Sequence, residues 1–482
     1  MRYFFLEDAS TEKRSILLIQ RRAVWIAVAF ILQALSTTNF TQIAPFLKPF
    51  SSLCPLPFML ASFFAIWMAL RPARSRTKIH RDERKQTTPT LWQRLILITT
   101  FGFAIGGSVM LIMGVVQSFS APQLTNDGTS LDTNAAMLLL EGRNPYTDSN
   151  MLDLARKFLP QPDWTTPLRV GQFADRLDYP TLTELRSVLD TDLKAGKAPE
   201  FESKVSYPVL SFLTLVPFTL FKNYNVLSFY ILSYLALVVV AWKVARPELR
   251  PWVVLLSLAN VPMWSSTIGG NLDVFYTLLI VLAWLLRDKR WISAICLGLA
   301  LASKQIAWYF IPFYIIMVLR HYGFKETIYR LTMAAGVGLA VNLPFILWNP
   351  HAWLAGIMAP VADPMFPLGI GFISLSTSHV LPYFRPEVYT ALEGVAMVLT
   401  LIWYWRICKK RPEAAMLFAV LPLFFAWRSL PSYFYCVAYP IFVLMSGRRT
   451  RRWLPARSSA QSSTPAQNVP LLPIPVEMGV PV

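Results

Sequence analysis

The chain has 482 residues, of which 55% are hydrophobic and only 15% are charged. Soluble proteins carry about 25% charged residues, so this composition excludes an ordinary soluble domain and predicts a polytopic membrane protein. The formal net charge of +18 would suggest nucleic-acid binding in a soluble protein. Here the basic residues lie in short loops between apolar segments, so no nucleic-acid partner is expected. The apolar runs are continuous rather than alternating, which predicts an all-α fold and excludes a membrane β-barrel.

Three apolar segments open the chain, and a polar insert follows at 120–206. The predicted membrane spans are 23–42, 52–70, 94–119, 207–222, 225–245, 252–268, 272–286, 291–303, 306–320, 328–348, 388–408, 413–427 and 431–446. We expect about 11–13 of them to cross the membrane. The chain therefore divides into an N-terminal part (1–119), the insert (120–206), a second membrane part (207–446) and a basic, Ser/Pro-rich tail (447–482) that is predicted to be disordered.

The loops with clustered Lys and Arg predict the orientation, because such loops stay in the cytoplasm. They are 71–85, 246–251, 287–290, 409–412 and 447–453. A cytoplasmic 71–85 loop places the insert on the outer face. Counting crossings onward from the insert then puts 246–251 outside, in conflict with its charge. A re-entrant or half-spanning 207–222 segment, which contains Pro208 and Pro217, removes this conflict.

The insert differs in composition from the rest of the chain. It holds 13 of the 27 acidic residues against nine Lys and Arg. Apolar residues recur at helical spacing in 131–140 and 151–159, and a third helix is expected around 180–195. We therefore expect short amphipathic helices that lie on the membrane or cap a cavity, rather than an independent globular domain.

Cysteine and histidine give no sign of a metal site or of a disulfide framework. The four cysteines form no CxxC pair, and the four histidines form no ligand pattern. The insert has no clear D-x-D pair beside its candidate carboxylates. We therefore expect neither a metal nor a cofactor.

Polar residues next to apolar spans are the candidates for function, because charge at such positions is costly. At the expected outer face a carboxylate could act as a general base, and Lys and Arg could hold a phosphate. The alternatives are a turn residue for the first Asp, an interfacial lysine or arginine, and structural or belt aromatics. The candidates are Asp127 and Asp132 for the base, and Arg143, Tyr146, Asn271, Lys304, Arg428 and Tyr435 for substrate binding.

Several stretches in order resemble glycosyltransferase family 87, a group of GT-C membrane glycosyltransferases. They are the GRNPY element at 142–146, "SYPVLSFLTLVPF" at 206–218, and the stretch 269–305 that begins GGNLD and ends ASKQ. The resemblance implies a GT-C-like helix bundle in the cell membrane with its active site on the extracytoplasmic face. It also implies a polyprenyl-phosphate sugar donor, often carrying mannose, and a lipid or glycan acceptor. The chain departs from the family pattern in two ways. Two apolar spans precede the segment that leads into the large loop, where a single one is usual, and the sequence YPVL at 207–210 replaces the more usual YPPL.

The resemblance places the catalytic base in the first large outer loop, shortly before the G-x-x-P-Y element. That position corresponds to Asp127 or Asp132. We favour Asp127, because Gly128 after it suits a tight turn at the membrane exit, whereas Asp132 could cap or decorate a helix that begins near residue 131. The competing interpretation is a multi-pass transporter or lipid flippase. Many transporters contain an internal repeat that relates their two halves. The sequence shows no such repeat, which argues against this interpretation.

Overall fold

The computed structural model describes residues 2–38, 53–71, 91–120, 122, 126–158 and 165–447, with the backbone alone for 2–15 and Asp127. The residues up to Gly447 form one unit. Nearly all of its regular structure is helical, as the sequence predicts. The basic 72–85 stretch and the tail after Gly447, which was predicted to be disordered, lie outside the described residues.

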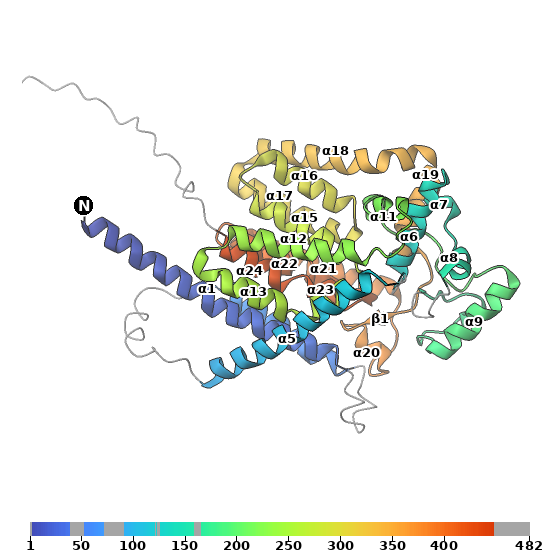
Figure 1. Ribbon diagram of the computed structural model, residues 1–482, viewed down its shortest axis with the longest axis horizontal. Coiled ribbons are helices and arrows are strands. Elements are labelled where there is room, and N and C mark those ends of the chain that lie inside the picture. The colour runs from blue at the N-terminus through green and yellow to red at the C-terminus, as the bar shows by residue number, and fades with distance from the viewer. Residues whose placement is uncertain are drawn as a thin grey trace, which may run out of the picture. The chain divides into compact units, whose positions relative to one another are not determined.

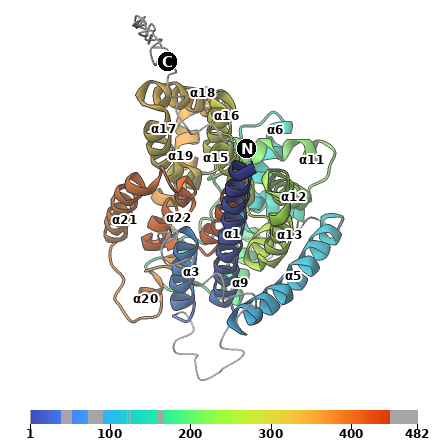
Figure 2. The ribbon, with the colours of Figure 1, turned by 90° about the vertical axis from the view of Figure 1, so that its left-hand side faces the viewer.

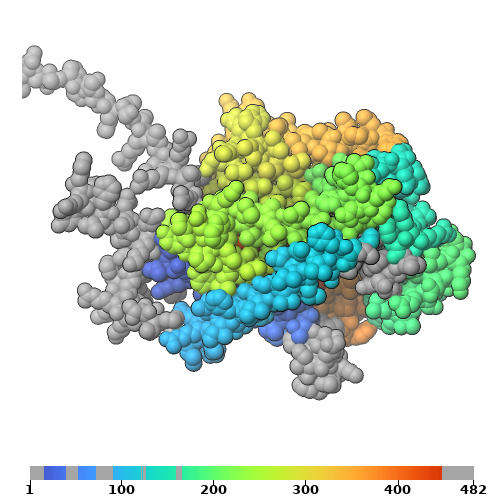
Figure 3. Space-filling view, in the orientation of Figure 1, coloured from blue at the N-terminus to red at the C-terminus, as the bar shows by residue number. Residues whose placement is uncertain are grey.

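Three helices precede the insert: α1 (Arg2–Ser36), α3 (Pro55–Leu70) and α5 (Leu91–Ser118). Helix α1 packs along α3, as Figure 2 shows. Helix α5 lies against α13 (Arg250–Ala259), where a side chain on Gly107 would come within 1.8 Å of the Leu258 carbonyl oxygen. Figure 3 shows α5 lying across the near face of the molecule. The exposed side chains of this helix include large apolar ones, such as Phe101 and Ile112. An apolar exposed face of this kind suits contact with lipid.

After the insert, some helices coincide with predicted segments, whereas 252–268 and 413–427 are divided into shorter pieces and α19 lies where no span was predicted. These helices pack around one large apolar core that includes Trp264, Trp284 and Tyr314. Two-residue parallel strands β1 (Leu368–Gly369) and β2 (Arg428–Ser429) join two loops. The main helices are α12 (Leu227–Val244), α13, α14 (Val261–Ile268), α15 (Asp273–Leu285), α16 (Arg290–Leu301), α17 (Ile311–Tyr322), α18 (Phe324–Trp348), α19 (Pro350–Ala362), α21 (Pro386–Ile407) and α24 (Ala438–Ser446).

The structure confirms an all-α membrane protein, with five helices in its described part long and apolar enough to cross a bilayer. They are Ile16–Ser36, α5, α12, α18 and α21. The other apolar helices are shorter, because prolines and polar residues divide the predicted segments. For example, Asn260 separates α13 from α14 and caps the latter through the Met263 amide. The total of 11–13 spans stays a prediction.

The segment 207–222 does not form a continuous span. It folds into α10 (Leu210–Leu213) and α11 (Val216–Leu220), and both are far shorter than the roughly 20 residues that a membrane crossing needs. The amide of Asn225 donates to the carbonyl oxygens of Gln117 (2.7 Å) and Ser120 (3.1 Å) at the end of α5. The chain therefore leaves α5 and enters α12 at the same end of the bundle, as a re-entrant segment requires.

The insert is built from short helices, as predicted: α6 (Asp127–Leu140), α7 (Pro145–Asp148), α8 (Met151–Phe158), the 3₁₀ turn η3 (Gly171–Phe173) and α9 (Leu182–Ala195). Helix α9 starts with a capping box of Thr181 and Glu184. Figure 1 shows α7, α8 and α9 gathered at the end of the bundle where α19 lies. Their small apolar cluster includes Phe366 from the loop after α19, so the insert shares its core with the membrane part.

The insert also contains a buried pair of carboxyl groups, Asp192 on α9 and Glu200, both about 5% exposed or less. Burial, and then the neighbouring Glu200 carboxylate, raise the pKa of Asp192 to about 6 from an ordinary 3.8. The folded insert therefore holds this proton more tightly than the unfolded chain does. The contribution of protonated Asp192 to the free energy of unfolding is complete below pH 3.8, and it is lost as the pH rises through 6.

Asp192→Asn is expected to stabilise the insert by about 1–2 kcal/mol at pH 7.5, because asparagine cannot acquire the buried charge. At pH 4 the stability of the variant should match that of the wild type. Hydrogen exchange of the α9 amides at the two pH values measures the effect. The exposed Asp190→Asn serves as the control, and an equal gain at both pH values would show that charge is not the cause.

Candidate active site

The N-terminus of α6 meets the 269–273 turn, although the two are about 140 residues apart in sequence. The side chain of Asn126 caps α6 by accepting from the Thr129 amide (2.8 Å), and its own amide donates to the Gly269 carbonyl oxygen. The Thr129 hydroxyl donates to the carbonyl oxygen of Gly270. Gly270 has φ +71°, a backbone conformation that glycine adopts without strain. The start of α6 and the GGNLD stretch at 269–273 are therefore joined by direct hydrogen bonds.

A narrow recess lies at this junction. It is too narrow to admit a water-sized sphere, so a ligand enters only if the walls of the recess move apart. The walls come from α6, the 207–211 segment, α12 and the 269–273 turn. The lining residues are Asn126, Gly128, Thr129, Asp132, Tyr207, Tyr230, Gly270, Asn271 and Leu272.

Two acidic candidates belong to α6, which begins at Asp127, four residues earlier than expected. Asn126 caps the helix, so Asp132 in the second turn does not act as the cap. Asp132 is 1% exposed, lines the recess and accepts a hydrogen bond from the Ser211 hydroxyl (2.8 Å). The backbone of Asp127 lies between the recess-lining residues Asn126 and Gly128, while its side chain lies outside the described part of the structure.

Lys304 is buried next to the recess. It follows α16, and its Nζ lies 2.6 Å from Oδ1 of Asp273, the first residue of α15. The same Nζ lies 5.1 Å from the ring centre of Tyr207, which lines the recess. Asn271 is part of the recess wall, and its amide donates to the Ser266 hydroxyl (3.1 Å). Lys304 and the recess therefore share Tyr207 as a neighbour.

Arg428 and Tyr435 follow the 3₁₀ turn η7 (Leu421–Phe425), in strand β2 and at the end of the short helix α23 (Ser432–Tyr435). Arg428 is half-buried in β2, and its side chain makes no hydrogen bond or ion pair with any described residue. Tyr435 is buried in the main apolar core. Neither residue lines the recess.

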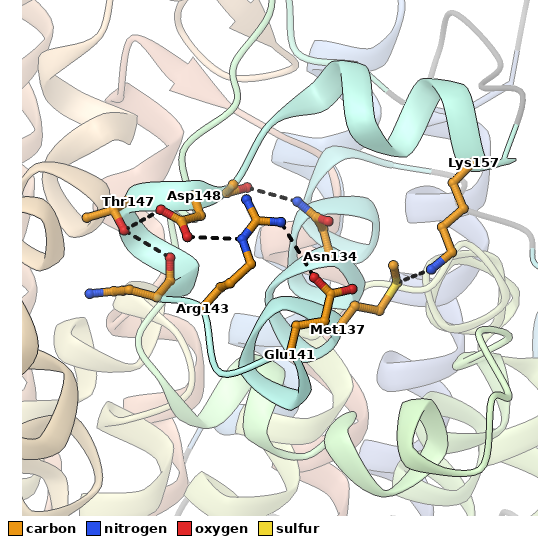
Figure 4. Close-up of polar contacts among 9 residues, drawn as sticks. Asn134, Met137, Glu141, Arg143, Thr147, Asp148 and Lys157 are labelled. Atoms are coloured by element: carbon orange, nitrogen blue, oxygen red, sulfur yellow. Dashed lines mark hydrogen bonds and ion pairs between the residues drawn. The ribbon is translucent and has the colours of Figure 1, made fainter.

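Arg143 and Tyr146 have different environments although they are three residues apart. Figure 4 shows the Arg143 guanidinium between two acidic side chains, with Nε 3.1 Å from Asp148 and Nη1 3.5 Å from Glu141. The arginine side chain is 46% exposed and lies apart from the recess. Tyr146 is buried, and its hydroxyl donates to the Tyr207 carbonyl oxygen (2.8 Å). Of the two, Tyr146 is thus connected to the recess, through Tyr207.

Sequence reasoning assigned no role to Tyr207 or Ser211. Both belong to the 206–218 stretch on which the resemblance partly rests, and the Tyr-Pro pair was the available signal for Tyr207. Nothing in the sequence pattern points to Ser211 as the partner of Asp132. Among the described residues no three His, Cys, Asp or Glu side chains converge as a metal site would require. Metal independence stays a prediction.

Gly270→Ala is expected to lower activity at least tenfold while the bundle stays folded. A Cβ at this position would lie 2.7 Å from the Thr129 hydroxyl oxygen, so the substitution pushes α6 away from the recess. The control is Gly196→Ala, which has a similar φ (+70°) but no atom within 4 Å of the new Cβ. It reproduces the backbone strain, about 1–2 kcal/mol, without the clash. Equal activity losses in both variants would contradict this contact's role.

Comparison with known families identifies one region. Residues 206–431 match the model of glycosyltransferase family 87. This region contains Asn271, Lys304 and Arg428, whereas the candidates on the insert precede it and Tyr435 follows it. No curated protein and no solved structure matches the chain.

Proposed function

Because residues 206–431 form a glycosyltransferase family 87 region, we propose that this membrane protein is an inverting transferase that uses a polyprenyl-phosphate sugar. Mannose is the first candidate for the sugar, and a lipid or glycan of the cell envelope is the acceptor. The reaction would take place on the extracytoplasmic face of the cell membrane. The observation that supports this most directly is the junction of α6 with the 269–273 turn, which brings an acidic helix next to the buried Lys304.

The reaction needs one base and a stabilised leaving group. A carboxylate of α6 takes the proton of the acceptor hydroxyl, and the acceptor oxygen then attacks the anomeric carbon. The bond from that carbon to the phosphate oxygen breaks, and polyprenyl phosphate departs with the electron pair. Lys304 and Arg428 stabilise its negative charge. A single displacement of this kind inverts the configuration at the anomeric carbon.

Asp127 is proposed as the base, with Asp132 as the alternative. The carboxylate of Asp132 is buried and already accepts from Ser211, so it is less available to an incoming hydroxyl. Asp127 occupies the first position of α6, between two residues of the recess wall. The helix N-terminus favours the ionised carboxylate at that position.

The remaining candidates bind substrate. Asn271 lines the recess and is proposed to donate to a sugar hydroxyl. Tyr146 holds Tyr207 in place through its hydrogen bond. Tyr435, which is buried in the main apolar core, is proposed to contact the donor. A phosphate contact of Arg143 would require its two surface ion pairs to open.

The class is tested with purified protein in nanodiscs. Radiolabelled polyprenyl-phosphate mannose is offered with acceptors extracted from the host envelope, in parallel with polyprenyl-phosphate glucose and arabinose. We expect transfer of one sugar to a lipid or glycan acceptor. If every donor remains intact and instead crosses the bilayer of proteoliposomes, the transporter interpretation holds.

A further inference from the structure

Asp273 and Lys304 form the most buried ion pair among the residues that the structure describes. The two side chains are 0% and 6% exposed, and Nζ lies 2.6 Å from Oδ1. The comparable Arg330–Glu326 pair, at 2.9 Å, includes a carboxylate that is 14% exposed. Removing two charges from water is costly, and their mutual attraction often fails to repay the cost. The pair therefore calls for an explanation other than stability.

The hydrogen bonds of this pair are incomplete. Oδ2 of Asp273 is buried and has no hydrogen-bond partner among the described residues, and the same holds for the nearby hydroxyl of Tyr276. A lysine ammonium has three donor hydrogens, and that of Lys304 makes its one hydrogen bond to Asp273. Buried polar groups are normally satisfied. Spare donors on a buried cation suit an anion that is bound for only part of a reaction cycle.

The pair also lies close to the recess. The ammonium of Lys304 lies over the ring of Tyr207, and Tyr207 is also one of the residues that line the recess. Asp273 directly follows Asn271 and Leu272 of the same wall. The other titratable neighbours of Lys304 are Tyr207, Tyr433 and Cys436, which are neutral in their ordinary states. Asp273 is therefore the negative charge that faces this lysine within the described part of the chain.

We propose that Asp273 is a positioning residue, which keeps Lys304 charged and holds its ammonium beside Tyr207 until the phosphate of the donor binds. This inference rests on the function proposed above. An isolated buried ammonium tends to lose its proton or to move toward water, and the counter-ion prevents both. When the phosphate arrives, the spare donors of Lys304 bind it while Asp273 retains its hydrogen bond. Since Asp273 already neutralises the lysine, the product polyprenyl phosphate is held loosely enough to leave.

The test compares the pH dependence of kcat/KM for the donor in the wild type and two variants. In Asp273→Asn the loss should be at least tenfold at pH 8.5 and clearly smaller at pH 6.5, because Lys304 now deprotonates more easily. In Asp273→Asn with Lys304→Arg the alkaline activity should return, because arginine keeps its proton. The control is Glu326→Gln, which breaks the Arg330–Glu326 ion pair and should leave the pH profile unchanged.

A second measurement uses polyprenyl phosphate without a sugar, read out as thermal stabilisation of each variant in detergent. Wild type should be stabilised at pH 8.5, and Asp273→Asn should be stabilised much less. If Asp273→Asn fails to fold, Asp273→Glu keeps the charge but displaces it, and should raise KM for the donor more than it lowers kcat. A folded Asp273→Asn with the wild-type pH profile overturns the inference alone. A wild type that neither transfers sugar nor binds polyprenyl phosphate overturns both it and the proposed function.

Discussion

Asp127→Asn is expected to reduce the rate of sugar transfer by about 10²–10⁴-fold, which is the usual contribution of a positioned general base. Asparagine keeps the size of the side chain but cannot accept the proton. Asp132→Asn should cost less than about tenfold, because an amide oxygen can still accept the hydrogen bond from Ser211. Initial rates at saturating donor, measured beside the melting temperature of each variant, separate catalysis from folding.

The matched control is Asp153→Asn, which removes an exposed acidic group from α8 of the same insert. Its rate should equal that of the wild type. A large loss in Asp132→Asn with none in Asp127→Asn would move the base to Asp132 and keep the mechanism. If neither substitution slows the reaction, the base does not lie on α6, and the proposed chemistry is wrong.

The helices were predictable because their signal is local. Long apolar runs such as α5 and α18 need only composition and length, and the prolines in 207–222 already indicated a segment that does not span. The start of α6 was placed four residues too late, since Asn-Asp-Gly has the composition of a turn. Only the contacts of Asn126 with Thr129 and Gly269 show that this asparagine is a helix cap.

The recess was not predictable in the same way, because it depends on contacts between distant parts of the chain. Asp132 meets Ser211 across 79 positions, and no spacing rule gives such a pair. Lys304 was proposed as a phosphate ligand, but its pairing with Asp273 follows from how α15 and α16 pack. For Arg143 the sequence did indicate a surface role, because Glu141 and Asp148 lie close enough along the chain to form ion pairs with it.

Arg428→Met is expected to raise KM for the donor about 10–100-fold, since a charge-assisted hydrogen bond contributes about 1.5–3 kcal/mol. This substitution should change the affinity for the donor without changing the stability of the fold. Arg428 is half-buried and makes no hydrogen bond or ion pair with the described residues. Its replacement by methionine therefore removes no polar contact within the described part, and methionine keeps much of the apolar stem, so the melting temperature should change little.

Two further variants identify the type of contact that Arg428 makes. Arg428→Lys should recover only part of the affinity for the donor, because lysine cannot bind a phosphate through two parallel hydrogen bonds. Arg156→Met removes an exposed cation of α8 and should leave KM unchanged. If Arg428→Met binds the donor as tightly as the wild type does, Lys304 is the remaining proposed cation for the leaving phosphate. The ammonium of Lys304 would then have to stabilise the charge of the leaving phosphate without Arg428.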